Sequence, residues 1–234
     1  MLEKLKIFDA ISKLIPGILL MSFLTPFIVY MYELNVLFEK VKDYKDFSTL
    51  LTTIFLVFSF VLGYFISAIA SSLEDWLFIL WGGRASSLLL RDKVKGKKLS
   101  NPVEMFGLLT RETNDSSLLS KPIEKFEEKD FAKLFQTAKN YCLKNIKEGK
   151  FAERIEDFGN AYIFSRNLFF TILIIFILTL TLLIKIPFSQ LIWGITFLLF
   201  TLYLSFRRCK QQSIYHTREI FSAFRSFLIL TNNA

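Results

Sequence analysis

Four long uncharged stretches alternate with charged segments along the chain. Residues 14–32, 48–73, 167–184 and 188–206 contain no Asp, Glu, Lys, Arg or His. About 20 apolar residues in a helix, each rising about 1.5 Å, cross the ~30 Å hydrocarbon layer of a bilayer. The pattern therefore predicts an all-α, polytopic membrane protein. We expect four transmembrane helices and a helical cytosolic insertion between the second and the third.

The polar segments between these stretches divide the chain further. We expect an N-terminal transmembrane hairpin, a cytosolic helical domain, a C-terminal transmembrane hairpin and a cytosolic amphipathic tail, at residues 1–73, 74–160, 161–206 and 207–234. In residues 127–148 the apolar side chains recur every three or four positions, which is typical of a water-soluble helix. The tail has a similar stripe, so we expect it to pack on the helical domain or to lie along the membrane surface.

The first uncharged stretch contains Pro16 and Pro26. Proline has no N–H to donate, so each proline in a helix frees a carbonyl on the preceding turn. Lipid offers no replacement donor, and neighbouring groups of the protein must therefore satisfy these carbonyls. We expect a retained helix that is bent or loosened near both prolines.

Basic residues give the expected orientation. The chain has 29 Lys and Arg against 21 Asp and Glu, a net charge of +8. Basic residues near span ends stay on the cytoplasmic side, and Lys13, Arg154, Arg166, Arg207 and Arg208 fit this rule. The distribution predicts a multi-pass protein of the inner (plasma) membrane with both termini and residues 74–160 in the cytoplasm. Its two widely spaced cysteines are expected to be free thiols.

Small residues recur at every fourth position of the second span, at Ser59, Gly63, Ser67 and Ser71. Helices in lipid associate through close backbone approach and hydroxyl hydrogen bonds, which small residues permit. The spacing predicts a helix-packing seam. It also favours a homo-oligomer within the bilayer.

The segment from Trp81 to Arg91 is the most distinctive short stretch, with Gly82, Gly83 and Arg84 followed by Ser86 and Ser87. One interpretation is a backbone nest at a helix start that offers donors to a phosphate or another anion. The simpler alternative is a helix stop followed by a capped helix. Neither GxxxxGK nor GxGxxG occurs here, so the segment matches no known nucleotide-binding loop.

Two short blocks carry a resemblance to a known family. They are Trp81-Gly-Gly with Ser86, Ser87, Leu89, Leu90 and Arg91, and the block from Asn160 to Leu168 with Tyr162, Phe164, Arg166 and Asn167. The chain resembles an uncharacterised family of bacterial multi-span membrane proteins with WGG-x-x-T-T-x-x-L-R and Y-x-F-x-R-N-L segments. Serines replace both threonines here, and the expected His-Arg-Asp is reduced to Arg91-Asp92. The resemblance implies membrane architecture and no assigned activity.

Arg166 and Asn167 stand at the entry to the third span. Arg166 is expected to extend toward lipid headgroups. Alternatively, Arg166 and Asn167 meet the Trp81–Gly83 turn and form one ligand or coupling site with it.

The spans contain no ionisable residue at their centres, which argues against ion pumps and proton-coupled carriers. No metal, cofactor or catalytic group is predicted, and the lone His216 is expected to be a packing residue. Our leading hypothesis is a non-enzymatic protein whose cytosolic domain senses a protein or small molecule and acts through a membrane oligomer. This build is similar to that of membrane effectors in anti-phage defence, an analogy of architecture alone.

Two alternatives stay open: a passive anchor or scaffold for a cytosolic partner, and a surface enzyme acting on lipid or nucleotide at residues 81–91 and 111–115. The lipid bilayer is a partner in every case. Nucleic acid is disfavoured, because the basic residues of the middle region are mixed with acids.

Overall fold

The computed structural model describes residues 2–32, 47–91, 102–113, 122–145 and 150–232, and Asn114 and Asp115 of the suggested enzyme loop lie outside these ranges. Almost all described residues are helical, and none of them forms a strand. Four helices are long and apolar enough to cross a membrane, in the ranges Ala10–Tyr32, Thr49–Ser72, Phe151–Ile184 and Phe188–Leu228. The prediction of an all-α chain with four such helices is confirmed.

The helices are α1 (Leu2–Tyr32), α3 (Phe47–Ser72), α4 (Glu74–Trp81), α5 (Ala85–Leu90), α6 (Pro102–Thr113), α8 (Glu128–Asn145), α9 (Lys150–Thr181) and α10 (Phe188–Asn232), with short 3-10 turns at Ile123–Lys125 and Leu182–Ile184. The chain forms two compact units. Unit 1 comprises Met1–Leu73 and Ile163–Cys209, and unit 2 comprises Glu74–Tyr162 and Lys210–Ala234. The tail thus belongs to the same unit as the middle region, and α9 and α10 each contribute residues to both units.

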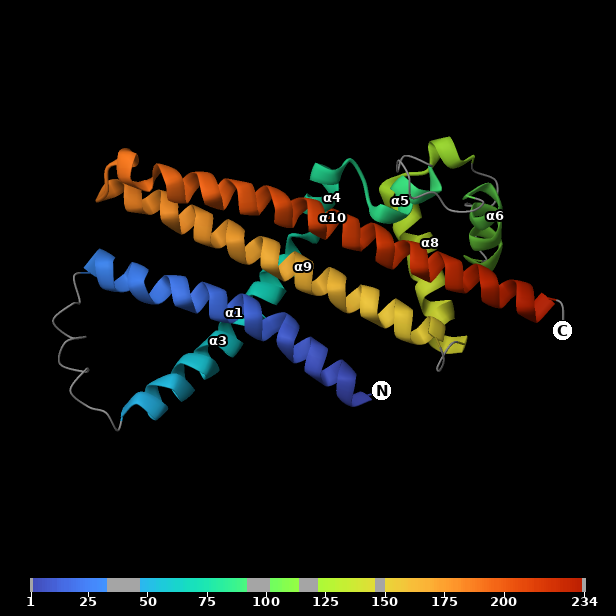
Figure 1. The fold of residues 1–234 in the computed structure, drawn as a ribbon. Coiled ribbons are helices and arrows are strands. Elements are labelled where there is room, and N and C mark those ends of the chain that lie inside the picture. The colour runs from blue at the N-terminus through green and yellow to red at the C-terminus, as the bar shows by residue number, and fades with distance from the viewer. Residues whose placement is uncertain (1, 33–46, 92–101, 114–121, 146–149, 233–234) are drawn as a thin grey trace. The chain divides into compact units, whose positions relative to one another are not determined.

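In unit 1, α1 and α3 cross with their backbones in direct contact (Figure 1). A Cβ atom built at Gly17 would overlap the carbonyl oxygen of Ser59, and one built at Gly63 would overlap the carbonyl oxygen of Lys13. Only glycine permits this approach at either position. The crossing is therefore built from backbone on backbone, as expected for helices packed in lipid.

Only part of the predicted seam faces this crossing. Ser59 and Gly63 are buried, Ser67 is partly buried and Ser71 is exposed, while Ile66 and Ala70 are buried instead. Because a helix turns by about 100° per residue, each four-residue step moves about 40° around it. A row at strict four-residue spacing drifts off the buried face after two steps. The buried residues of α3, Ser59, Gly63, Ile66 and Ala70, are instead separated by four, three and four positions.

Helices α1 and α9 run parallel in unit 1. Asn167 Nδ2 donates to the carbonyl oxygen of Ser12 at 3.2 Å, and Lys185 Nζ donates to that of Met31 at 2.7 Å. The two acceptors are about five helical turns apart, or about 28 Å. This length is close to the thickness of the hydrocarbon layer. Helix α10 runs back along α9 after the turn at residues 182–187 (Figure 1). Phe169 of α9 packs on Phe206 of α10.

Unit 2 has an apolar core rich in phenylalanine. Its buried members include Leu89, Met105, Leu109, Phe126, Phe131, Leu134, Phe221 and Phe224 from α5, α6, α8, the segment before α8 and the tail of α10. The tail packs edge-on against α8 through Phe135 with Phe221 and Tyr141 with Phe224. Burying an aromatic side chain of this kind contributes about 2 kcal/mol or more. The tail of α10 therefore contributes to the core of unit 2.

The α1–α3 crossing can be tested with Gly63→Leu. The added side chain must displace the backbone of Lys13, so we expect a loss of stability of about 1–3 kcal/mol. The measurement is unfolding of the purified chain in a mixed-micelle denaturant titration.

Gly194→Leu is the matched control, because Gly194 lies in a span-capable helix with no atom within 4 Å of a built Cβ. Equal stabilities for the Gly63 and Gly194 variants would contradict the crossing.

Candidate functional site

The turn after α4 depends on two glycines. Gly82 and Gly83 have φ angles of 80° and 132°, in the region that only glycine adopts freely. Their N–H groups donate to the carbonyl oxygens of Ile79 and Phe78, which ends the helix. A Cβ at Gly83 would lie 2.7 Å from Ser87 Oγ and 2.9 Å from Glu128 Oε1. Gly83 is therefore required for its conformation and for the space that these side chains fill.

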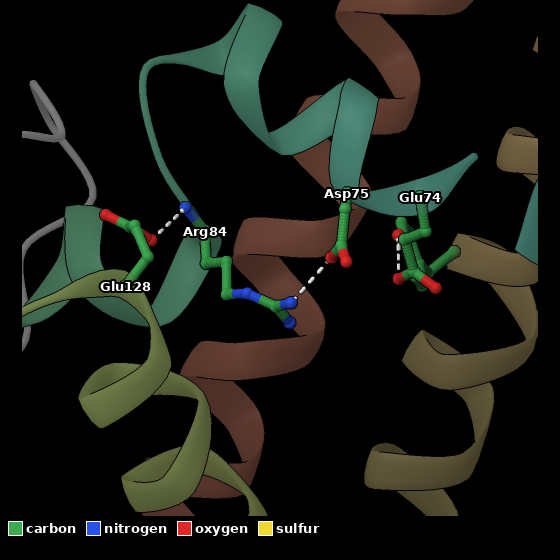
Figure 2. Close-up of polar contacts among 5 residues, drawn as sticks. Glu74, Asp75, Arg84 and Glu128 are labelled. Atoms are coloured by element: carbon green, nitrogen blue, oxygen red, sulfur yellow. Dashed lines mark hydrogen bonds and ion pairs between the residues drawn. The ribbon is translucent and has the colours of Figure 1, made fainter. Parts of the chain in front are cut away.

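A carboxylate of the chain itself occupies the suggested anion nest. The backbone N–H of Arg84 donates to Glu128 Oε2 at 2.9 Å, as Figure 2 shows. Glu128 is the first residue of α8, 44 positions along the chain. Ser87 Oγ donates to the Arg84 carbonyl oxygen at 2.9 Å, and Ser86 is buried. The turn thus binds an internal anion, and this contact joins α8 to the start of α5.

The Arg84 guanidinium faces the other way (Figure 2). Its Nη2 lies 2.5 Å from Asp75 Oδ1, and its Cζ lies 4.8 Å from the centroid of the Phe78 ring. Both partners belong to α4, so Arg84 folds back on the helix that precedes it. The pair is exposed, and exposed ion pairs contribute at most about 1 kcal/mol.

The remaining predicted residues of this segment connect other parts of unit 2. Trp81 is buried, and its carbonyl oxygen accepts from Lys210 Nζ at 2.8 Å. Arg91 Nη2 donates to the Phe126 carbonyl oxygen at 2.5 Å, and its guanidinium lies over the Phe131 ring. The segment from Trp81 to Arg91 therefore contacts α8, the segment before it and the α10 tail, and its described polar contacts are internal to unit 2.

Arg166 and Asn167 lie in unit 1, and both are buried. The acceptor that Asn167 contacts, the Ser12 carbonyl, lies four residues before Pro16, so it is the carbonyl that Pro16 leaves without a helical donor. Asn167 supplies the replacement donor from another helix. The sequence analysis anticipated that such a donor was needed and did not identify it. A joint site with the Trp81–Gly83 turn stays a hypothesis.

His216 is an additional buried feature of unit 2. Its ring stacks on Tyr162 and meets Phe135 edge-on, and a Cβ at Gly159 would lie 3.3 Å from its Nε2. It lies in unit 2, ten residues beyond the uncharged stretch 188–206 and after Arg207, Arg208 and Lys210. Burial, together with the positive charge of Lys139, lowers the pKa of His216 from 6.5 to about 4.

Among the residues with described coordinates, no group of three or more His, Cys, Asp and Glu side chains could hold a metal ion. No protein-family model matches the chain, and no curated protein or solved structure matches it significantly. The family resemblance of the two short blocks stays a prediction.

The contact between Asn167 and Ser12 predicts an interaction between two substitutions. Asn167→Leu removes the donor that Asn167 supplies to the carbonyl of the buried Ser12, and it is expected to cost about 1–3 kcal/mol. With Pro16→Ala in the same chain, the restored N–H at position 16 can satisfy Ser12. The cost of Asn167→Leu should then be smaller.

A double-mutant cycle in a mixed-micelle denaturant titration measures this difference directly. Strictly additive costs would show that Asn167 does not compensate for Pro16.

His216 predicts that stability depends on pH. Because the pKa of the folded state is lowered to about 4, the unfolded chain binds the proton more readily between pH 6.5 and 4. The stabilisation is complete above pH 6.5 and is lost as the pH falls toward 4. We expect a decrease of about 1–3 kcal/mol across this window.

Unfolding of the full chain in detergent at pH 7, 6 and 5 measures this loss. His216→Phe keeps an aromatic ring and should show a smaller decrease, since only the carboxylates then titrate. Identical pH profiles for the two chains would contradict the assignment to His216.

Proposed function

We propose that this chain is a non-enzymatic membrane protein in which unit 2 senses a partner and unit 1 responds within a membrane oligomer. One observation carries the proposal. Helix α9, at Lys150–Thr181, and helix α10, at Phe188–Asn232, each continue without interruption from one unit into the other. A displacement of the partner-binding unit would therefore act directly on two span-capable helices.

Contacts within unit 2 support a responsive role for these helices. Arg154 of α9 lies 2.9 Å from Glu219 of α10, and Phe158 packs against Tyr215. His216 and Tyr162 stack in the same region. Any partner that changes the packing of the α8 face on the tail also changes the ends of both helices. The proposal includes a cytoplasmic unit 2, on the charge distribution described above, and the bacterial inner membrane, on the family resemblance of the two short blocks.

A passive anchor or scaffold is the second candidate, and the Gly82–Arg84 turn favours it. Glu128 and Asp75 already fill the two positions at which Arg84 would meet an external anion. Because Arg84 in this turn is already bound by residues of unit 2, the unit would present a fixed surface to a cytosolic protein. Under this candidate the membrane helices hold the partner at the bilayer and do not respond to it.

Permeability assays separate the two candidates. We expect the purified chain to be oligomeric in detergent by density-matched sedimentation, and its expression in bacteria to increase uptake of a membrane-impermeant dye. Ile163→Pro interrupts α9 where the two units meet in the sequence, at a cost of about 3 kcal/mol to the helix. It should abolish the dye uptake.

Ile163→Ala keeps the helix and is the control. A strictly monomeric chain whose expression does not increase dye uptake would exclude the proposal and favour the passive anchor or scaffold. Equal dye uptake with Ile163→Pro and Ile163→Ala would show that the continuity of α9 is not required.

A further inference from the structure

We infer that helix α4 is a membrane-interface helix that inserts its exposed face, Trp76, Ile79 and Leu80, into the headgroup and upper acyl region of the bilayer. This inference depends on α3 crossing the membrane. It does not depend on the proposed sensing activity, since an interface helix serves an effector and an anchor equally.

The apolar side chains of α4 point in two opposite directions. Leu77 and Trp81 are buried, with 0% and 4% of their surface exposed. Ile79, Leu80 and Trp76 are 76%, 50% and 43% exposed. At about 100° per residue, these three side chains lie on one half of the helix, opposite Leu77 and Trp81. Helix α4 is thus apolar on the face that the protein does not cover as well as on the face that it does.

The connection to α3 identifies what covers this face. Only Leu73 separates the end of α3 at Ser72 from the start of α4 at Glu74. Eight helical residues extend about 12 Å, so no residue of α4 can lie farther than this from the point where the chain leaves the span. The headgroup region on each side of the hydrocarbon is about 5–8 Å thick, and tryptophan is enriched in it. A helix α4 that turns along the bilayer surface keeps its uncovered face within this region, and the inference assigns it that orientation.

The charges around this face are compatible with lipid. Asp75 is the only charged residue on the exposed half of α4, and Arg84 pairs with it at 2.5 Å. The pair adds no net charge, so the face is not repelled by anionic headgroups. Glu74, at the covered edge, accepts a 2.5 Å hydrogen bond from the Tyr162 hydroxyl, as the dashed line beside Glu74 in Figure 2 indicates. Both acids at the start of α4 are therefore partnered inside unit 2.

Site-specific quenching tests the inference on the full chain. Ile79→Cys is labelled with an environment-sensitive fluorophore and reconstituted in vesicles of phosphatidylethanolamine and phosphatidylglycerol. The native Cys142 and Cys209 are buried free thiols, and the unsubstituted chain measures any background labelling. We expect blue-shifted emission, strong quenching by lipids with a nitroxide high on the acyl chain, and protection from aqueous iodide. Leu80→Cys, on the same face, should behave alike.

Leu143→Cys is the matched control, because Leu143 is an equally apolar side chain of unit 2, 63% exposed, and lies 24 residues before the uncharged stretch 167–184. Lipid quenching should be several-fold weaker there, and iodide quenching stronger. Iodide quenching of the Ile79 label equal to that of the Leu143 label would overturn the inference. So would protection from iodide without lipid quenching, which would indicate a protein partner or a second copy. Lipid quenching of equal strength at Ile79, Leu80 and Leu143 would overturn it as well, because α4 would then be no closer to lipid than α8.

Discussion

Hydrocarbon offers no hydrogen-bond donors, so every backbone carbonyl within a span must find one in the protein. In α1, Pro16 has no N–H to donate to the Ser12 carbonyl, and the side-chain amide of Asn167 in α9 donates to it instead. This hydrogen bond sets the position of α9 along the axis of α1 near Ser12. The hydrogen bond from Lys185 to the Met31 carbonyl sets it at the opposite end of α1. The donor that replaces the missing N–H of Pro16 therefore comes from the helix that packs beside α1.

The helices of the two units pack through different interactions. Unit 1 brings backbones together at Gly17 and Gly63, because in lipid the gain comes from close contact and not from removing apolar groups from water. Unit 2 buries phenylalanine side chains such as Phe131 and Phe221, for which removal from water is the main driving force. Helices α9 and α10 take part in both, and their residue types change accordingly along their length. Sensitivity to pH is correspondingly expected in unit 2, around His216.

The sequence predicted the span-capable helices well, because an uncharged stretch of this length has few other stable environments. It predicted the partners of single residues poorly. Asn167 and Ser12 are 155 positions apart, and Arg84 and Glu128 are 44 apart. The spacing of neighbouring residues in the sequence therefore gives no indication of either contact. Ser71 illustrates a different limit: a regular four-residue row is easy to see in a sequence, whereas a helix of 3.6 residues per turn buries a staggered one. The need for a donor near Pro16 was predictable, and its identity was not.

The contact between Arg84 and Glu128 bears on where a signal would enter unit 2. An external phosphate at this turn would have to displace a carboxylate that already accepts the Arg84 N–H and begins α8. Losing a hydrogen bond to a charged group of this kind costs about 1.5–3 kcal/mol, and the carboxylate would then lie beside a second negative charge. A partner that binds the outer surface of α8 incurs neither cost. It would still act on the tail, because Phe135 and Tyr141 of α8 contact Phe221 and Phe224. Under the proposed sensing role, the energetics therefore favour the outer surface of α8 over the glycine turn as the place where a partner would bind.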